Sequence, residues 1–432
     1  MEVSKTSKHV RLQNIIGEAR VTQKLQVILQ SLPSINFSRF TQAFRQSTFS
    51  LSFNLGAILA GVLLAAYFGS FSLAPWGLAI YPGILSMRGV IGGLFSGRLS
   101  TGLHIGTIRI GFTKNTRNFY MLWRATIVLT LESSIMLGAI ATIFGVVFWG
   151  VDIGESFTIL GVVISTMALS LILISPITVL VSTLSFQRGL DPDVTVYPII
   201  ATIADVVVTI CYILMLEVFF KWDYVGRYLI GSFSLFFFCL ALYILQNDLD
   251  EEGFVKTIKE SFFTIILVAF IVNITGSFLT RITSIVGSRP GIYLIYPALI
   301  DTIGSVGSIV GSTATTKLVL GTLKPSFSSI KKHTYEIGAA WVASLVMFIL
   351  YAIISHTMFL TSLAEFTRLL VVLLITNVLA VLSMVEIAFA VGVLTYRRGW
   401  DPDNFVIPIE SSLADTITTV ALLLALTLII LQ

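Results

Sequence analysis

The sequence is poor in charge: only 12% of its 432 residues are Asp, Glu, Lys or Arg. An ordinary soluble domain carries about 25%. The apolar share is 56% and the mean hydropathy is +0.93. These values exclude a soluble enzyme, a nucleic-acid-binding protein and a disordered chain. They predict an all-α polytopic membrane protein, because only a lipid bilayer accommodates so many apolar residues.

Cysteine and recognisable catalytic motifs are also scarce. Cys211 and Cys239 both lie inside apolar segments, so we expect no disulfide framework and no thiolate metal site. The first 46 residues are basic and polar without a long apolar core, so no cleaved signal peptide is expected. No Ser/His/Asp set, zinc-protease motif or phosphate-binding loop is apparent. The sequence therefore predicts a protein that is not an enzyme.

Eleven apolar segments are long enough to cross a bilayer, which takes roughly 17–25 residues per helix. They lie near residues 47–69, 76–108, 124–149, 156–186, 194–219, 228–246, 261–286, 292–323, 335–358, 365–395 and 406–431. The segments 76–108 and 292–323 are long and rich in glycine, so a break or a re-entrant turn is an alternative in each.

Basic residues are distributed unevenly between the two sides of this topology. With a cytoplasmic N-terminus, 20 of the 27 Lys and Arg residues fall on the cytoplasmic side and five on the other, while Arg88 and Arg98 lie within a span. This bias follows the positive-inside rule. It supports eleven crossings of the cell membrane, with the C-terminus outside.

Two segments recur later in the chain. Residues 188–210 match residues 398–420 at 11 of 23 positions, and residues 81–108 match residues 296–323 at 8 of 28. We therefore expect two five-helix repeats that insert in the same direction, with a pseudo-two-fold axis along the membrane normal. The predicted parts are a basic cytoplasmic segment, 1–46, a first repeat, 47–220, a linker with one transmembrane helix, 221–260, and a second repeat, 261–432.

Two aspartates stand at equivalent positions of the repeats, in otherwise apolar helices. Asp205 follows the triplet Asp-Pro-Asp at residues 191–193 and a proline, and Asp415 follows the triplet at residues 401–403 with the same spacing. Each aspartate is predicted about 10 Å beyond its proline along the helix. That position lies well inside the bilayer, where an ionisable side chain is costly and marks a functional site by default.

Hydroxyl residues share a helix face with each aspartate: Thr202 and Thr209, Ser412 and Thr419. If the two faces meet across the two-fold axis, Asp205 and Asp415 approach each other and repel unless a cation or a proton lies between them. Mg²⁺ suits such a site, because it prefers oxygen ligands and gives up its water reluctantly. The alternative is that each aspartate pairs with Arg88 or Arg98, or caps a broken helix.

Further oxygen ligands are available in the second repeat, where Asp301 and Ser305 occupy positions that hold Ser86 and Val90 in the first. The glycine runs that include Gly89 and Gly304 either let helices pack closely or unwind beside a pore. The triplet residues favour helix capping, with cation binding at a cytoplasmic mouth as the alternative. They are Asp191, Asp193, Asp401 and Asp403.

The paired spacing resembles that of the MgtE family of magnesium transporters. The last membrane helix of that family carries Asp-Pro, then Pro, then a buried Asp, similar to residues 191–205 and 401–415 here. Its second helix carries a proline before a Gly/Asn-rich run, similar to residues 82–93 and 297–307. Residues 98–101 also resemble a run in the fused, two-domain solute-carrier relatives of that family.

The resemblance implies a single cation pathway between two five-helix units, with Asp205 and Asp415 at the pore site. The asparagine that the family carries after the second-helix glycine is Val90 in one repeat and Ser305 in the other. We therefore expect transport of a divalent cation, Mg²⁺ above all, by a monomer whose partners are the metal ion and the lipid bilayer. The alternatives are a secondary transporter that uses the aspartates for Na⁺ or H⁺ coupling, and a membrane scaffold.

Overall fold

The computed structural model describes residues 37–112, 114–187, 192–287, 289–398 and 402–430. The side chains of residues 37, 192–199, 402–411 and 430 are outside this description. The described residues form helices and connecting turns and no strand. This agrees with the all-α prediction.

The chain is a succession of helices, most of them long. In order they are α2 (Phe37–Ser52), η1 (Phe53–Gly56), α3 (Ala57–Ala66), α4 (Phe68–Phe71), α5 (Tyr81–Ile105), α6 (Arg117–Phe144), η2 (Gly145–Trp149), η3 (Ile153–Glu155), α7 (Ser156–Gln187), α8 (Pro192–Lys221), α9 (Asp223–Asn247), α10 (Glu252–Val286), α11 (Pro290–Val319), η4 (Phe327–Lys332), α12 (Thr334–Phe359), α13 (Leu363–Arg397) and α14 (Pro402–Ile430). Helices α8 and α14 begin at the prolines of the two Asp-Pro pairs, where those pairs predict a helix start.

Ten helical segments of the described chain are long and apolar enough to cross a membrane. They correspond to ten of the eleven predicted spans. The remaining predicted span, residues 76–108, contains α5, which has 25 residues and is not among the ten. Glycines, serines and the two arginines Arg88 and Arg98 lower the hydropathy of this helix.

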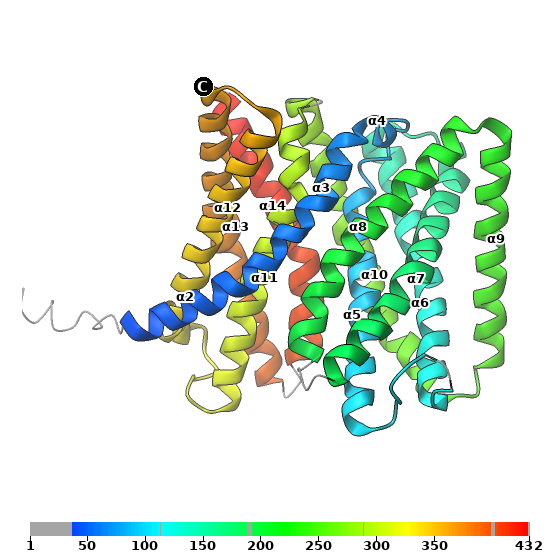
Figure 1. Ribbon diagram of the computed structural model, residues 1–432, viewed down its shortest axis with the longest axis horizontal. Coiled ribbons are helices and arrows are strands. Elements are labelled where there is room, and N and C mark those ends of the chain that lie inside the picture. Colours follow the sequence, from blue (N-terminus) through cyan, green and yellow to red (C-terminus); the bar gives the residue numbers. More distant parts are fainter. Residues whose placement is uncertain (1–36, 113, 188–191, 288, 399–401, 431–432) are drawn as a thin grey trace, which may run out of the picture.

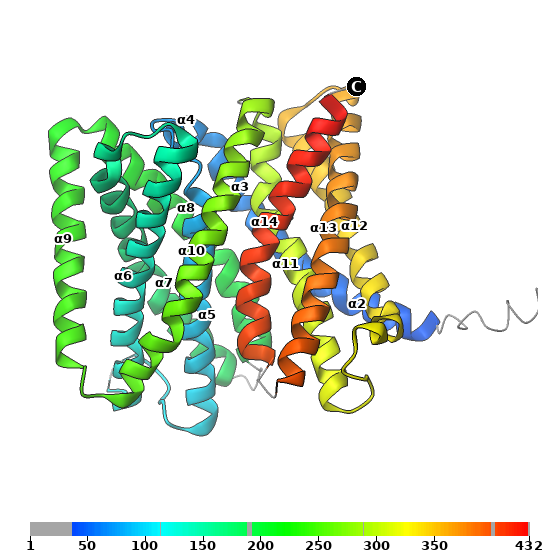
Figure 2. The same ribbon diagram turned by 180° about the vertical axis from the view of Figure 1, so that it is seen from behind.

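The helices form an elongated bundle (Figures 1 and 2). Helix α9 lies at one edge, α12 and α13 lie at the other, and α5, α8, α10, α11 and α14 lie between them. Helices α2 and α3 run obliquely across the bundle toward α4. We call the end where α4 lies the α4 end, and the end where α2 begins the α2 end. Helix α14 finishes at the α4 end, so the described chain starts and finishes at opposite ends.

The glycine-rich segments contain no break, and the alternative of a re-entrant turn was wrong. Helix α5 is continuous over Tyr81–Ile105, and α11 is continuous over Pro290–Val319, even through Pro297. Some of their glycines allow close packing, whereas a Cβ atom on Gly89 or Gly97 would meet nothing within 4 Å. A Cβ atom on Gly83 would lie 2.7 Å from a Leu137 methyl group, and one on Gly307 would lie 2.3 Å from the Met384 methyl group.

The interruption lies instead in the first predicted span, where the 3₁₀ turn η1 separates α2 from α3. Helix α8 crosses at this point. The Oγ1 atom of Thr202 donates to the Phe53 carbonyl at 3.4 Å, and a Cβ atom on Gly56 would lie 2.2 Å from the Thr202 methyl group. A short 3₁₀ stretch inside a long helix commonly marks a hinge or local strain.

Two backbone crossings join segments that are far apart in the chain. A Cβ atom on Gly61 of α3 would lie 1.7 Å from the Leu294 carbonyl oxygen of α11, and one on Gly276 of α10 would lie 1.9 Å from the Ala79 carbonyl oxygen before α5. Residues 276 and 294 each lie 215 positions after 61 and 79. The first helix of each sequence repeat therefore crosses a segment of the other repeat.

A polar cluster ties α11 to the start of α12 at the α2 end. His333 precedes α12, is fully buried, accepts at Nδ1 from Lys317 Nζ at 3.2 Å and contacts Thr313 Oγ1 through Nε2 at 3.0 Å. Lys317 Nζ also lies 2.6 Å from Glu336 Oε1. Burial, and then the charge of Lys317, lower the pKa of His333 from 6.5 to about 4, against the opposing charge of Glu336.

Acid is expected to destabilise this cluster. Because the folded state holds His333 neutral and the unfolded state protonates it, stability is complete above pH 6.5 and falls as the pH drops toward 4. The effect amounts to at most about 3 kcal/mol. We expect His333→Gln to lose less stability than wild type between pH 7 and pH 4.5, measured by thermal unfolding in detergent. Equal losses in both proteins would assign the acid sensitivity to other groups.

Candidate functional site

A small cavity with several charged residues in its wall lies between the central helices, with a volume of about 90 Å³. Asp205 of α8, Asp301 of α11 and Asp415 of α14 line it, together with Ser86 and Arg88 of α5. The other lining residues are Pro82, Leu85, Gly89, Ala201, Ala204, Pro297 and Ile300. A space of this size holds a few water molecules, so it admits a small ion that keeps part of its hydration shell.

The cavity is built from both sequence repeats. Ser86 Oγ donates to an oxygen of Asp415, and the side chains of Asp205 and Asp301 form a hydrogen-bonding pair. Ser86 and Asp301 are equivalent in the repeats, as are Asp205 and Asp415. Each contact therefore joins the glycine-rich helix of one repeat to the last helix of the other.

A tyrosine and a threonine meet within each repeat beside the aspartate. The Tyr81 hydroxyl lies 2.9 Å from Thr209 Oγ1, and the Tyr296 hydroxyl lies 2.8 Å from Thr419 Oγ1. Each threonine Oγ1 donates to the backbone carbonyl of the aspartate four residues earlier, at 2.6 Å in both repeats. A threonine hydroxyl has one proton, so each tyrosine is the donor.

Arg88 brings a positive charge to the cavity wall. Its side chain is 2% exposed, and its Nε and Nη1 atoms have no hydrogen-bond partner among the described residues. Among the residues that the structure describes, no ion pair joins Arg88 or Arg98 to Asp205 or Asp415. Arg98 instead lies 3.8 Å from Glu260. These contacts do not support the alternative in which the arginines neutralise the paired aspartates.

The predicted site residues separate into two groups. Asp205, Asp301, Asp415 and Gly89 line the cavity, and the remaining ones with described side chains lie next to it along the same helices: Ser305, Gly304, Thr202, Thr209, Ser412 and Thr419. Ser305 contacts Asn54 of η1 at 3.1 Å. Sequence reasoning did not select Asn54, Tyr81, Tyr296 or Ser86 as site residues, although the internal alignment pairs Tyr81 with Tyr296 and Ser86 with Asp301.

The structure does not test the residues that were predicted at a cytoplasmic mouth. Asp191 and Asp401 lie outside the described residues, and the side chains of Asp193 and Asp403 are likewise not described.

The donor set fits a hydrated cation. In the described part of the chain, no three His, Cys, Asp or Glu side chains lie close enough together to hold a bare metal ion. Mg²⁺ usually retains several waters and is held by one or two carboxylates. The hydrogen bond between Asp205 and Asp301 requires a proton on one of them. When that proton leaves, three carboxylates and one guanidinium carry two net negative formal charges at the cavity, which a divalent cation balances.

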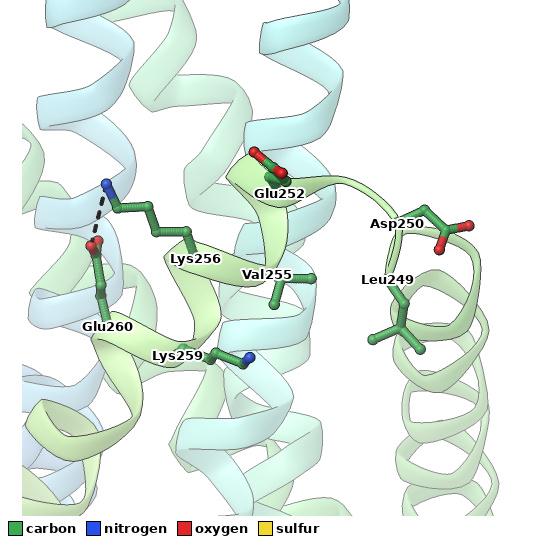
Figure 3. A pocket seen from close by; sticks show the side chains of 7 residues that line it. All are labelled: Leu249, Asp250, Glu252, Val255, Lys256, Lys259 and Glu260. Carbon is green, nitrogen blue, oxygen red and sulfur yellow. Dashed lines mark ion pairs between the residues drawn. The ribbon is translucent and has the colours of Figure 1, made fainter.

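A larger depression of about 400 Å³ lies at the junction of α9 and α10 (Figure 3). Its charged residues are of both signs, and Lys256 Nζ lies 3.7 Å from Glu260 on the next helical turn. Two lysines offset two of the three carboxylates at this open surface, whereas three carboxylates face a single guanidinium in the buried cavity.

Comparison with known proteins identifies the family to which the chain belongs. The family model of MgtE, a divalent cation transporter, matches residues 81–215 and matches again at residues 296–425. A search of curated proteins and a search of solved structures gave no match. The two matched regions begin 215 residues apart and together cover more than half of the sequence. With its many membrane-spanning helices, the chain belongs to the MgtE family of divalent cation transporters.

Proposed function

We propose that this protein carries Mg²⁺ across the membrane through a pathway between its two repeats, with the hydrated ion held by Asp205, Asp301 and Asp415. The observation that carries the proposal is the convergence of these three carboxylates, from both repeats, on one cavity at membrane depth. Buried carboxylates without enough countercharge repel one another, and a divalent cation removes that repulsion.

The proposed architecture has eleven crossings, with α5 as the eleventh. Helix α5 lies inside the bundle between helices that do span (Figures 1 and 2), so its low hydropathy suits a helix that faces a polar pathway. The start and finish of the described chain at opposite ends of the bundle agree with an odd number of crossings. The positive-inside bias then assigns the α2 end to the cytoplasm and the α4 end to the outside.

The pseudo-two-fold arrangement is supported by contacts that occur twice. The two tyrosine–threonine pairs and the two glycine crossings relate one repeat to the other. Because both repeats lie in one chain, a monomer supplies the complete cavity. The basic segment 1–46, the repeats 47–220 and 261–432, and the linker 221–260 remain the proposed division of the chain.

Mg²⁺ is expected to stabilise the purified protein. Binding to the folded state alone adds about 2.7 kcal/mol of stability when the ion concentration is 100 times its Kd. We expect a saturable rise in the unfolding temperature with Mg²⁺, measured in detergent at constant ionic strength with Na⁺ as the control. Proteoliposomes should then take up Mg²⁺ down its gradient. No Mg²⁺-dependent stabilisation together with no flux would contradict the proposal.

A second candidate is transport coupled to Na⁺ or H⁺. The direct pairing of Asp205 with Asp301 favours it, because two adjacent carboxyl groups also accommodate a proton or a monovalent ion. The flux assay separates the two. Mg²⁺ flux that persists without any Na⁺ or H⁺ gradient supports uncoupled transport, and flux that collapses with that gradient supports coupling.

A further inference from the structure

The cavity has different surroundings at its two ends. On α5, Tyr81 precedes all the lining residues and is fully buried, whereas Gly89 at the other limit of the lining is exposed. On α11, Tyr296 precedes the lining residues in the same way and is also fully buried. The side chains of Asp205 and Asp301 are half-buried, so the polar groups are not sealed from every direction.

Aromatic residues occupy the end of the cavity that faces the α4 end. Tyr81 packs edge-on against Phe71, with ring centroids 5.2 Å apart. Thr209 and Thr419 follow the cavity-lining residues of α8 and α14, so each tyrosine–threonine bond lies beyond the aspartates on this same side.

We propose that Tyr81 and Tyr296 are positioning residues that close the pathway at the α4 end, each fastened by its hydroxyl to the helix that carries the aspartate of its own repeat. The structure is then the conformation in which the cavity is reached from the α2 end. The inference deepens the proposed cation pathway and rests on it.

Two hydrogen bonds in series connect each tyrosine to the aspartate of its own repeat. Each tyrosine donates to a threonine whose own proton goes to the carbonyl of Asp205 or Asp415. A rotation of α8 or α14 that follows the ion therefore moves the acceptor of the tyrosine. Removing both hydroxyls leaves the rings and their volume in place and deletes only these two bonds, so the closed arrangement loses its preference.

A cysteine at position 89 reports access to the cavity. A Cβ atom on Gly89 meets no other atom within 4 Å, and Gly89 lines the cavity. The assay uses the full chain carrying Cys211→Ala, Cys239→Ala and Gly89→Cys, with a membrane-impermeant thiol reagent added to right-side-out or inside-out vesicles in the absence of Mg²⁺. We expect labelling from the side of the α2 end only.

Tyr81→Phe together with Tyr296→Phe is expected to raise labelling from the α4 side about tenfold, since two hydrogen bonds are lost. Tyr212→Phe is the matched control. Tyr212 is fully buried and stacks beside Tyr81 with centroids 6.4 Å apart, but its hydroxyl donates to the Gly77 carbonyl instead. Labelling of the double variant from the α2 side at the wild-type rate shows that the variant is folded.

Equal labelling of wild type from both sides would overturn the proposal, and so would a double variant that behaves like Tyr212→Phe. Because labelling is scored without Mg²⁺, these outcomes are independent of the cargo. One-sided labelling without Mg²⁺ flux would leave the closure standing and reject Mg²⁺ as its ion.

Discussion

Asp205→Asn and Asp415→Asn are each expected to reduce the apparent Mg²⁺ affinity in proteoliposome flux by roughly 10–100-fold, and the double variant is expected to transport at background. A carboxylate that holds a hydrated ion acts through water, and loss of such an outer contact typically costs 10–100-fold in metal affinity. Neutralising both residues leaves Asp301 to face Arg88 in the cavity, so the attraction for a divalent cation is largely removed.

Glu132→Gln is the matched control for this experiment. Glu132 lies on α6, and both of its carboxylate oxygens are buried without a hydrogen-bond partner among the described residues. It does not line the cavity. The substitution removes a carboxyl group whose oxygens are buried elsewhere in the bundle, and flux should be unchanged. Wild-type flux in both aspartate variants, or an equal loss in Glu132→Gln, would remove the aspartates from the pathway.

Gly61→Ala is expected to destabilise the folded protein by about 3 kcal/mol or more, and Gly276→Ala by a similar amount. The added methyl group would lie 1.7 Å from the Leu294 carbonyl oxygen in one case and 1.9 Å from the Ala79 carbonyl oxygen in the other. Both clashing atoms are backbone atoms of buried segments, so the clash can be removed only if a whole helix shifts. Overpacking at such a place costs 1–3 kcal/mol and occasionally more.

Gly231→Ala provides the comparison, because a Cβ atom there meets nothing within 4 Å. Alanine within a helix is favoured over glycine by roughly 0.5–1 kcal/mol, so this variant should unfold at the wild-type temperature or above. Tryptophan fluorescence in detergent measures all three unfolding temperatures. If Gly61→Ala and Gly231→Ala have the same unfolding temperature, the backbones of α3 and α11 do not approach each other as closely as the structure shows.

Much of the fold follows from patterns that a single segment contains. Long apolar runs predict ten of the membrane helices, and the Asp-Pro pairs predict where α8 and α14 begin. The two buried aspartates were found because the repeat places Asp205 and Asp415 in register, and because a carboxylate is conspicuous in an apolar helix. Each of these signals is local or repeats at a fixed offset.

The features that sequence reasoning missed depend on which helices cross. No periodic pattern in residues 53–56 predicts a 3₁₀ turn, and Thr202 of α8 packs against this turn from a distant part of the chain. The glycine runs are compatible with close helix packing or with an unwound stretch beside a pore. Only the structure shows that α5 and α11 stay helical through them. The internal alignment shows only that Ser86 occupies the position of Asp301 in the first repeat, and the structure adds its contact with Asp415 of the opposite repeat. Such contacts depend on how two helices pack together, so the sequence of either helix alone contains no periodic pattern that predicts them.

The crossing of Gly61 with Leu294 also constrains how this protein is made. A ribosome releases α3 long before it has synthesised α11, so the first spanning helix must wait in the bilayer without the surface against which it finally packs. Helix α10, by contrast, emerges when its site beside Ala79 already exists. Assembly is therefore completed only when the second repeat has been inserted, and a chain cut after the linker helix would leave α3 without its partner unless a second molecule lent one.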